Sequence, residues 1–303
     1  MQPPYISLDY YAGTRDYDTT PHIWFGELPP IWQQLHGRQG YKIREQELFT
    51  GLEFMYNPDR QIMGCHIDLS GAVLQRFVGC HPYLTPIDAL DKSGISAYKP
   101  SRIDVAIDIP DAGLFARDLY NQFVKVPAPV GRRKVTLIHS TGDRGGKTVY
   151  VGSRTSPLFL RIYDKDAQSA GKNPVSRIEF ELKGAAAKKI HSELWTVKRS
   201  LSEVAAGLLL TVGTIGAVPE LAALIDGQRA IEWEPREPAQ TSTEKWLVRQ
   251  VLPTFVQDAL VNGYPLLLDW FFELVWERIR TSMPVGELDA LITQTDQSQS
   301  REL

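Results

Sequence analysis

The sequence predicts an α+β fold: largely antiparallel sheets with flanking helices, followed by a C-terminal helical region. Between residues 41 and 183, short segments alternate apolar and polar residues with the period of two that half-buried strands show. Beyond a linker at Glu234-Pro-Arg-Glu-Pro238, apolar residues instead recur three and four apart, as in amphipathic helices. The strands form two groups, at 41–70 and 102–183, so two sheets in tandem are one arrangement that the pattern allows.

An N-terminal α+β segment is expected over 1–94. Its first 40 residues are rich in Tyr, Pro and Gly, with scattered aromatic side chains. Alternating segments then run from 41 to 70, with a turn signal at Asn57-Pro-Asp-Arg60. A short helix is expected over 71–77.

A second, basic domain is expected over 95–232, and it opens with the alternating segment 102–108. Asp111 is suited to cap a helix over 111–124, whose apolar residues share one face. Further strands are expected at 134–139, 148–151, 161–165 and 177–183, and helices at 184–194 and on to about 225.

The last segment, 233–303, is expected to be helical with a polar tail. Amphipathic patterns cover 243–260 and 266–280 and carry five aromatic residues, Trp246, Trp270, Phe271, Phe272 and Trp276. Packing of a small helical subdomain is favoured for these residues over a recognition surface.

Charge is distributed unevenly along a chain whose net charge is only −3. Residues 95–200 contain 19 Lys and Arg against 10 Asp and Glu, whereas the rest of the chain contains 14 against 26. A basic centre in an acidic protein favours a module that binds a polyanion. Two cysteines exclude a disulfide framework, and no signal peptide or membrane span is evident, so we expect a cytoplasmic protein.

Three segments of the second domain place charged residues on one face of a strand, because successive side chains point to opposite faces. The shared face would hold Arg102, Asp104, Asp108, Arg161, Tyr163, Lys165, Arg177, Glu179, Glu181 and Lys183. Carboxylates are the ligands that Mg²⁺ and Mn²⁺ prefer, so the candidate metal ligands are Asp104, Asp108, Glu179 and Glu181. The alternative is that these carboxylates only pair with neighbouring cations on a solvated face.

Basic and hydroxyl side chains beside this face suit a substrate that carries phosphate. The turn Gly152-Ser-Arg-Thr-Ser156 offers hydroxyls and a guanidinium as a phosphate clamp. The preceding Gly146-Lys-Thr148 lacks the first glycine of a nucleotide-binding P-loop, which would fall at Thr141. The candidate DNA contacts are Arg102, Ser153, Arg154, Ser156, Arg161, Lys165, Arg177 and Lys183, and no organic cofactor is expected.

Tyr163 is the candidate nucleophile. The pKa of a free tyrosine is ~10, but Arg161, Lys165 and a divalent cation nearby would favour the phenolate. Attack on a phosphodiester would give a phosphotyrosyl–DNA bond and a free 3′-hydroxyl, and the cation would offset the charge that develops. Tyr150 is the competing tyrosine, but its neighbours in the sequence are apolar.

These segments also carry a resemblance. In their order along the chain, 102–108, 148–156, 161–165 and 177–183 resemble the motifs of the replication initiation factor (Rep_trans) family, and 66–71 and 245–253 add to the likeness. That family contains rolling-circle initiators of plasmids and filamentous phages and related relaxases. The resemblance implies an HUH-like initiator core that nicks one strand at an origin and stays attached through a tyrosine at the position of Tyr163. It also implies metal-binding carboxylates at Asp104, Asp108 and Glu179.

The sequence departs from classical HUH endonucleases, because no two histidines flank a single hydrophobic residue; His66-Ile-Asp68 comes nearest. A second catalytic tyrosine close to the first is also missing, so ending a replication round would need a second subunit, and a homodimer is expected. The expected partner is origin DNA, single-stranded, hairpin or supercoiled, and helicase recruitment is one role that fits the C-terminal helices. Two alternatives stay open: a non-catalytic origin- or operator-binding protein, and a metal-dependent nuclease that uses water.

Overall fold

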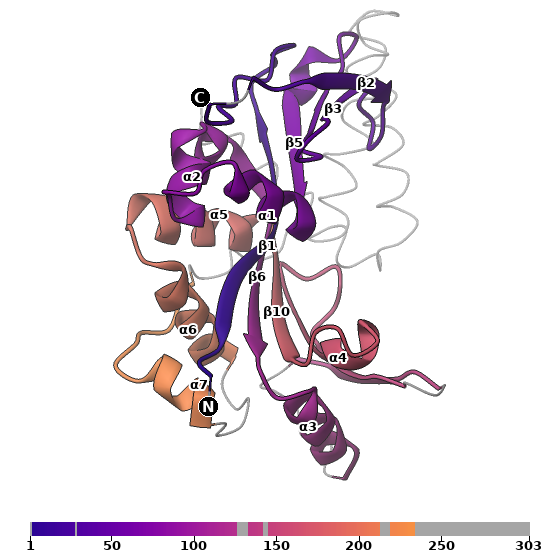
Figure 1. The fold of residues 1–303 in the computed structure, drawn as a ribbon, viewed down its shortest axis with the longest axis vertical. Coiled ribbons are helices and arrows are strands. Elements are labelled where there is room, and N and C mark those ends of the chain that lie inside the picture. The colour runs from indigo at the N-terminus through magenta and orange to yellow at the C-terminus, as the bar shows by residue number, and fades with distance from the viewer. Residues whose placement is uncertain (1, 28, 126–132, 142–144, 213–218, 234–303) are drawn as a thin grey trace, which may run out of the picture. The chain divides into compact units, whose positions relative to one another are not determined.

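The computed structural model describes residues 2–27, 29–125, 133–141, 145–212 and 219–233, which all belong to one compact unit (Figure 1). The linker at 234–238 and the helices expected over 243–260 and 266–280 lie outside the described residues.

Ten strands of the described residues form one antiparallel sheet in the order β2-β3-β4-β5-β1-β6-β10-β9-β8-β7. Their bounds are β1 Tyr5–Arg15, β2 Trp32–His36, β3 Ile43–Glu47, β4 Glu53–Tyr56, β5 Cys65–Ser70, β6 Lys99–Ile109, β7 Val135–His139, β8 Lys147–Val151, β9 Leu158–Asp164 and β10 Ser176–Lys183. The expectation of two sheets in tandem is therefore wrong. β1 pairs with β5 on one side and with β6 on the other, and so joins both strand groups into a single sheet.

The sheet has two halves that repeat one connection pattern. Each half starts with a central strand, β1 or β6, runs through three outer strands, and returns beside its starting strand as β5 or β10. A helix follows each returning strand, α1 (Gly71–Gly79) after β5 and α5 (Ala185–His191) after β10. The predicted strand group at 102–183 lies within the second half, whereas the group at 41–70 covers only β3, β4 and β5 of the first half, and the sequence pattern does not predict β1 and β2.

Helices cover the apolar face of the sheet. α1 contacts β1 and β5, α5 contacts β6 and β10, α6 (Leu201–Val212) contacts β1 and β6, and α3 (Leu114–Lys125) contacts β7 to β10. Alternate residues of the central strands, such as Val105 and Phe180, are completely buried beneath them. The remaining helical elements are α2 Pro86–Lys92, α4 Lys165–Gln168, α7 Pro219–Ile225, two 3₁₀ turns at Gln61–Met63 and Ile95–Ala97, and a π-helical turn at Ser192–Thr196. No described helix is long and apolar enough to cross a membrane.

A bulge in β1 puts two successive side chains on the opposite, charged face. Leu8 pairs with Val105 and Tyr10 pairs with Asp104, so Asp9 is the extra residue between them. Asp9 reaches Arg177 of β10 at 2.7 Å, and the Tyr10 ring lies 4.3 Å below the guanidinium of Arg102. The first forty residues thus contribute to the same face as the three charged strands.

The cap predicted at Asp111 is confirmed, although the helix begins three residues later. The Asp111 carboxylate accepts hydrogen bonds from the backbone N–H of Gly113 (3.0 Å), Phe115 (2.7 Å) and Ser176 (2.9 Å). Ala112 and Gly113 have φ values of 51° and 79°, so the backbone cannot be helical before Leu114. The same carboxylate therefore caps α3 and ties it to the start of β10.

Candidate active site on the charged face

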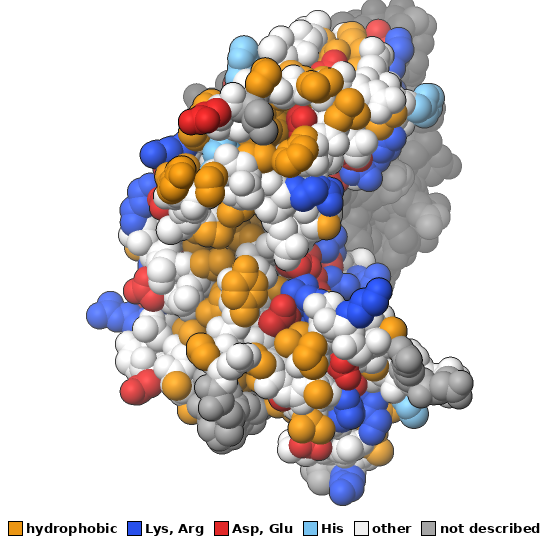
Figure 2. Space-filling model, in the orientation of Figure 1, with side chains coloured by type: hydrophobic (Ala, Val, Ile, Leu, Met, Phe, Trp, Pro, Cys, Tyr) orange, Lys and Arg blue, Asp and Glu red, His pale blue; other side chains and the backbone are white. Residues whose placement is uncertain are grey.

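Strand pairing brings the three predicted charged segments together as neighbours. β10 lies between β6 and β9, with Glu181 opposite Asp104 and Arg177 opposite both Asp108 and Tyr163. Paired residues share a face, so the predicted charged face exists. Lys165 is the exception among the predicted strand residues, because β9 ends at Asp164 and Lys165 begins α4, from which its Nζ reaches Asp108. Acidic and basic side chains lie next to one another around β10 and α4 rather than being separated by sign (Figure 2).

Tyr163 is hydrogen-bonded to a buried carboxylate. Its hydroxyl donates to Glu179 Oε2 at 3.1 Å, and Arg161 binds the other oxygen of Glu179. Burial and the negative charge of Glu179 raise the pKa of Tyr163, while Arg177 lowers it less. The protein alone therefore keeps the phenol protonated, contrary to the expected effect of Arg161 and Lys165. What it supplies instead is a proton acceptor in contact with the hydroxyl.

Asp104 and Glu181 form the acidic centre of the face. Arg102 donates to both oxygens of Asp104, at 2.8 and 2.5 Å, and to Glu181 at 3.1 Å. Burial, with the nearby charges of Glu179 and Glu181, raises the pKa of Asp104 to about 6. Although burial alone would raise it, the pKa of Glu181 is lowered by Lys183 and Arg102. Negative charge at Asp104 is thus only partly compensated by the protein.

Asp108 belongs to a different cluster, centred on Arg177. The Arg177 side chain is 6% exposed and donates to Asp108 at 2.6 and 2.7 Å and to Asp9 at 2.7 Å. Lys165 Nζ lies 3.4 Å from the same Asp108 carboxylate, and these cations hold the pKa of Asp108 below its usual value despite burial. Each of the three guanidinium nitrogens of Arg177 therefore binds a carboxylate within the protein. We assign Arg177 and Asp108 to holding strands β1, β6 and β10 together.

The four predicted metal ligands thus fall into three settings: Asp104 lies with Glu181, Asp108 is bound by Arg177, and Glu179 is bound by Tyr163 and Arg161. Within the part of the chain that the structure describes, no three His, Cys, Asp or Glu side chains converge as a cation site. Asp104 and Glu181 still fit a hard divalent cation in donor type, because they face each other across β6 and β10 and the charge of Asp104 is incompletely balanced. Without a metal ion, Arg102 binds the carboxylate oxygens of Asp104 and Glu181, and Lys183 binds Glu181 as well.

The loop between β8 and β9 lies beside this face. Ser153, Arg154 and Thr155 are exposed, and Gly152 makes the turn with φ +96°. Lys183 Nζ donates to the backbone oxygen of Arg154 at 2.5 Å, which fixes the loop against β10. The predicted contacts Ser153, Arg154 and Ser156 are thereby placed at the edge of the site. Tyr10 and Asp9 also belong to the face, and sequence reasoning missed them; the alternation in Tyr5-Ile-Ser-Leu is the signal for their strand.

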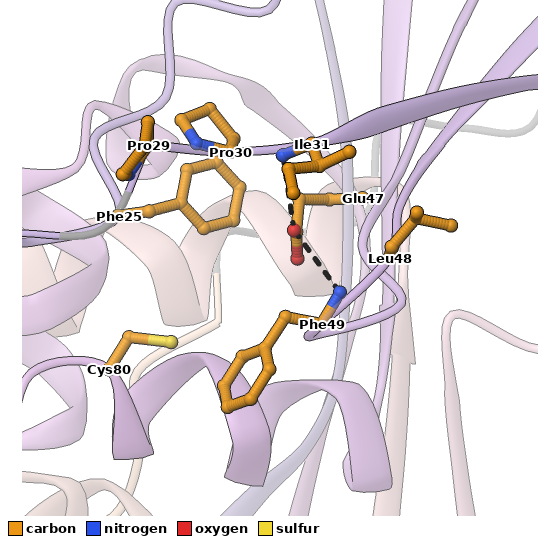
Figure 3. A pocket seen from close by; sticks show the side chains of 8 residues that line it. All are labelled: Phe25, Pro29, Pro30, Ile31, Glu47, Leu48, Phe49 and Cys80. Atoms are coloured by element: carbon orange, nitrogen blue, oxygen red, sulfur yellow. Dashed lines mark hydrogen bonds between the residues drawn. The ribbon is translucent and has the colours of Figure 1, made fainter.

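A separate crevice lies on the other half of the fold and is not part of this site. It has a volume of about 510 Å³ and is lined by Phe25, Pro29, Pro30, Ile31, Glu47, Leu48, Phe49 and Cys80 (Figure 3). Its one carboxylate, Glu47, accepts hydrogen bonds from the backbone N–H of Phe49 (3.1 Å) and Thr50 (2.7 Å). Glu47 closes the β3–β4 turn, and the other lining side chains are apolar apart from the Cys80 thiol, which donates to the backbone oxygen of Arg76 at 3.4 Å.

Asp104→Asn should change how stability depends on pH. The folded pKa of about 6 lies above the ~3.9 of an unfolded aspartate, so the folded state holds more protons between these values and stability falls as pH rises through them. The free energy of unfolding of Asp104→Asn, minus that of the unchanged protein, should increase by on the order of 1–3 kcal/mol from pH 4 to pH 7. Urea titrations at several pH values measure this. The exposed Asp59→Asn serves as control, and an equal pH dependence in both variants would contradict the assignment.

Comparison with known proteins supports the strand arrangement. A family model described as "Replication initiation factor" matches residues 99–257, just over half of the chain. A solved structure of a rolling-circle replication initiator protein from Geobacillus stearothermophilus is similar in fold, with a TM-score of 0.54 and 19% identity over 84% of this chain and 96% of that one. No curated protein gives a match. The family match includes β6, β9, β10 and the loop before β9.

Proposed function

Because the chain belongs to the replication initiation factor family, we propose that it nicks one DNA strand at a replication origin and stays linked to the new 5′ end through Tyr163. The observation that carries this proposal is the Tyr163 hydroxyl, which donates at 3.1 Å to the buried Glu179. A phenol in contact with a carboxylate can attack without first becoming a phenolate. This arrangement suits covalent catalysis with a general base.

In the proposed step, the Tyr163 oxygen attacks the phosphorus of a phosphodiester and its proton passes to Glu179. A bond forms between the phenolic oxygen and phosphorus, and the bond between phosphorus and the 3′-oxygen breaks. The leaving 3′-oxygen takes up a proton from water, and Glu179 releases the phenol proton to solvent, so the products are a 5′-phosphotyrosyl strand and a free 3′-hydroxyl. Arg161, bound to the same Glu179, lies where it can offset negative charge on the phosphoryl oxygens.

Asp104 and Glu181 are the residues that we propose to hold Mg²⁺ or Mn²⁺. Bound there, the cation would supply Lewis-acid polarisation of the phosphodiester. Glu179 is left out of this pair because we propose it as the proton acceptor for Tyr163, whose hydroxyl it already contacts. Asp108, paired with Arg177, is left out as well.

The exposed cations and hydroxyls around the β8–β9 loop are the proposed DNA contacts. Ser153 and Arg154 are exposed, and Arg102, Arg161, Lys165 and Lys183 keep 23–35% of their side chains accessible beside the carboxylates. Such contacts position a backbone and carry no sequence information by themselves. Single-stranded or hairpin origin DNA is the proposed partner, and a second copy of the chain or a helicase remains a prediction for residues outside the described part.

Labelled DNA separates this function from its alternatives. The chain is incubated with supercoiled and single-stranded DNA of the element that encodes it, with Mg²⁺, Mn²⁺ or EDTA, and the products are run on a denaturing gel. We expect a metal-dependent nick in which the 5′ end stays with the protein and the 3′ end is free. Cleavage without any protein-linked strand would indicate a nuclease that uses water, and binding without cleavage would indicate an origin-binding protein.

A further inference from the structure

A second tyrosine lies on the charged face, one strand away from Tyr163. Tyr150 of β8 pairs with Arg161 of β9, and Tyr163 is two residues further along β9. Diagonal neighbours on one face of a sheet have Cβ atoms roughly 7 Å apart. The neighbours of Tyr150 in the sequence are apolar, but its neighbours across the sheet are those of the proposed active site.

Surrounding residues hold the Tyr150 ring in place, and the residue is neither buried nor fully exposed. Arg154 Nη2 donates to the hydroxyl oxygen at 3.3 Å, and the Arg154 guanidinium lies 5.6 Å from the ring centre. The rings of Tyr150 and Phe159 pack in an edge-on arrangement, with their centroids 5.2 Å apart. Among the described residues, no acceptor takes the Tyr150 hydroxyl proton. The oxygen is therefore next to a cation of the proposed DNA-binding loop, with its proton available.

Arg161 connects the two tyrosines. Its position on β9 is flanked by Tyr150 on β8 and by Glu179 on β10. One end of its guanidinium binds Glu179, while its Nε has no hydrogen-bond partner among the described residues. A guanidinium placed between two phenols can donate hydrogen bonds to a phosphate attached to either of them and offset its charge.

From this arrangement we propose that Tyr150 is a second nucleophile, which lets one copy of the chain perform the strand transfer that closes a replication round. The proposal rests on the function proposed for Tyr163. It replaces the expectation that a second subunit must supply the second tyrosine. The two phenols would act in turn on two phosphodiesters brought to the same face.

The transfer balances as two displacements. With Tyr163 still carrying the first strand, the Tyr150 oxygen attacks the phosphodiester of the regenerated origin, and the proton of Tyr150 ends on the departing 3′-oxygen. The new 3′-hydroxyl then attacks the phosphorus on Tyr163, which reseals the first strand and returns Tyr163 as a free phenol. Tyr150 keeps the second 5′ end.

Strand transfer between two labelled oligonucleotides of different length tests this proposal on the full chain. Tyr150→Phe should form the first covalent adduct within about twofold of the unchanged protein but lose strand transfer at least tenfold, together with the species in which one polypeptide carries two strands. The retained first adduct shows that the variant is folded. Tyr120→Phe, on α3 at the opposite face, is the matched control and should change neither readout.

Each outcome decides between the two proposals. Normal transfer by Tyr150→Phe would overturn the role of Tyr150 alone and leave the nicking function intact. Loss of the first adduct in Tyr150→Phe, with an unchanged circular dichroism spectrum and melting temperature, would show that Tyr150 is needed for the first step, which overturns the order proposed for the two tyrosines. No adduct with the unchanged protein would overturn both.

Discussion

Tyr163→Phe is expected to abolish the covalent protein–DNA species while DNA binding stays within about twofold. The substitution removes the oxygen that we propose attacks phosphorus in the first nicking step, and phenylalanine keeps the ring that fills the face. Loss of a covalent nucleophile lowers a rate by on the order of 10³-fold or more. The adduct is measured on denaturing gels and binding by fluorescence anisotropy with the same DNA.

Tyr5→Phe is the matched control for this variant. Tyr5 is 61% exposed and lies on the same face, opposite Asp108 at the end of β1. Its replacement should leave adduct formation unchanged. If Tyr163→Phe still formed the adduct at a rate within tenfold of the unchanged protein, Tyr163 would not be the nucleophile.

Replacing Arg177 is expected to have the largest effect on stability. Its guanidinium is 6% exposed and satisfies Asp108 through two hydrogen bonds and Asp9 through a third. Arg177→Met would leave both carboxylates without their main partner in a partly buried place. Removing one member of a buried ion pair costs about 3–5 kcal/mol, which urea unfolding of the whole chain measures.

Two comparisons test the reason for that loss. Arg154→Met removes an exposed arginine and should change the free energy of unfolding by no more than about 0.5 kcal/mol. The double variant Arg177→Met with Asp108→Asn should lose less free energy of unfolding than Arg177→Met alone, because the Asp108 carboxylate that has lost its partner is no longer charged. A loss below about 1 kcal/mol for Arg177→Met would contradict the structural role of this cluster.

The second half of the sheet is largely predictable from sequence. Alternation in 102–108, 161–165 and 177–183 predicts β6, β9 and β10 and the side chains that share their face, because a period of two is a local property of the backbone. The cap at Asp111 is equally local. Those features need no knowledge of which strand pairs with which.

Pairing between distant strands is what the sequence could not supply. The bulge at Asp9 interrupts the alternation of β1, so the sequence pattern does not predict the strand that unites the two halves and allows two sheets. The different roles of Asp104 and Asp108 also depend on which residues of a distant strand they pair with. Asp104 and Asp108 are equivalent on an isolated strand, and only their partners on β10, Glu181 and Arg177, make one an acidic centre and the other part of an ion pair.

Identification of the tyrosine that carries DNA tests the central claim most directly. The adduct is trapped with labelled origin DNA, digested with nuclease and protease, and the nucleotide-bearing peptide is sequenced by mass spectrometry. With a single-site substrate, we expect one modified residue, Tyr163, next to Asp164-Lys165 in the peptide. A nucleotide on Tyr150 or on any other residue, or a nicked product with no peptide attached, would contradict the role of Tyr163.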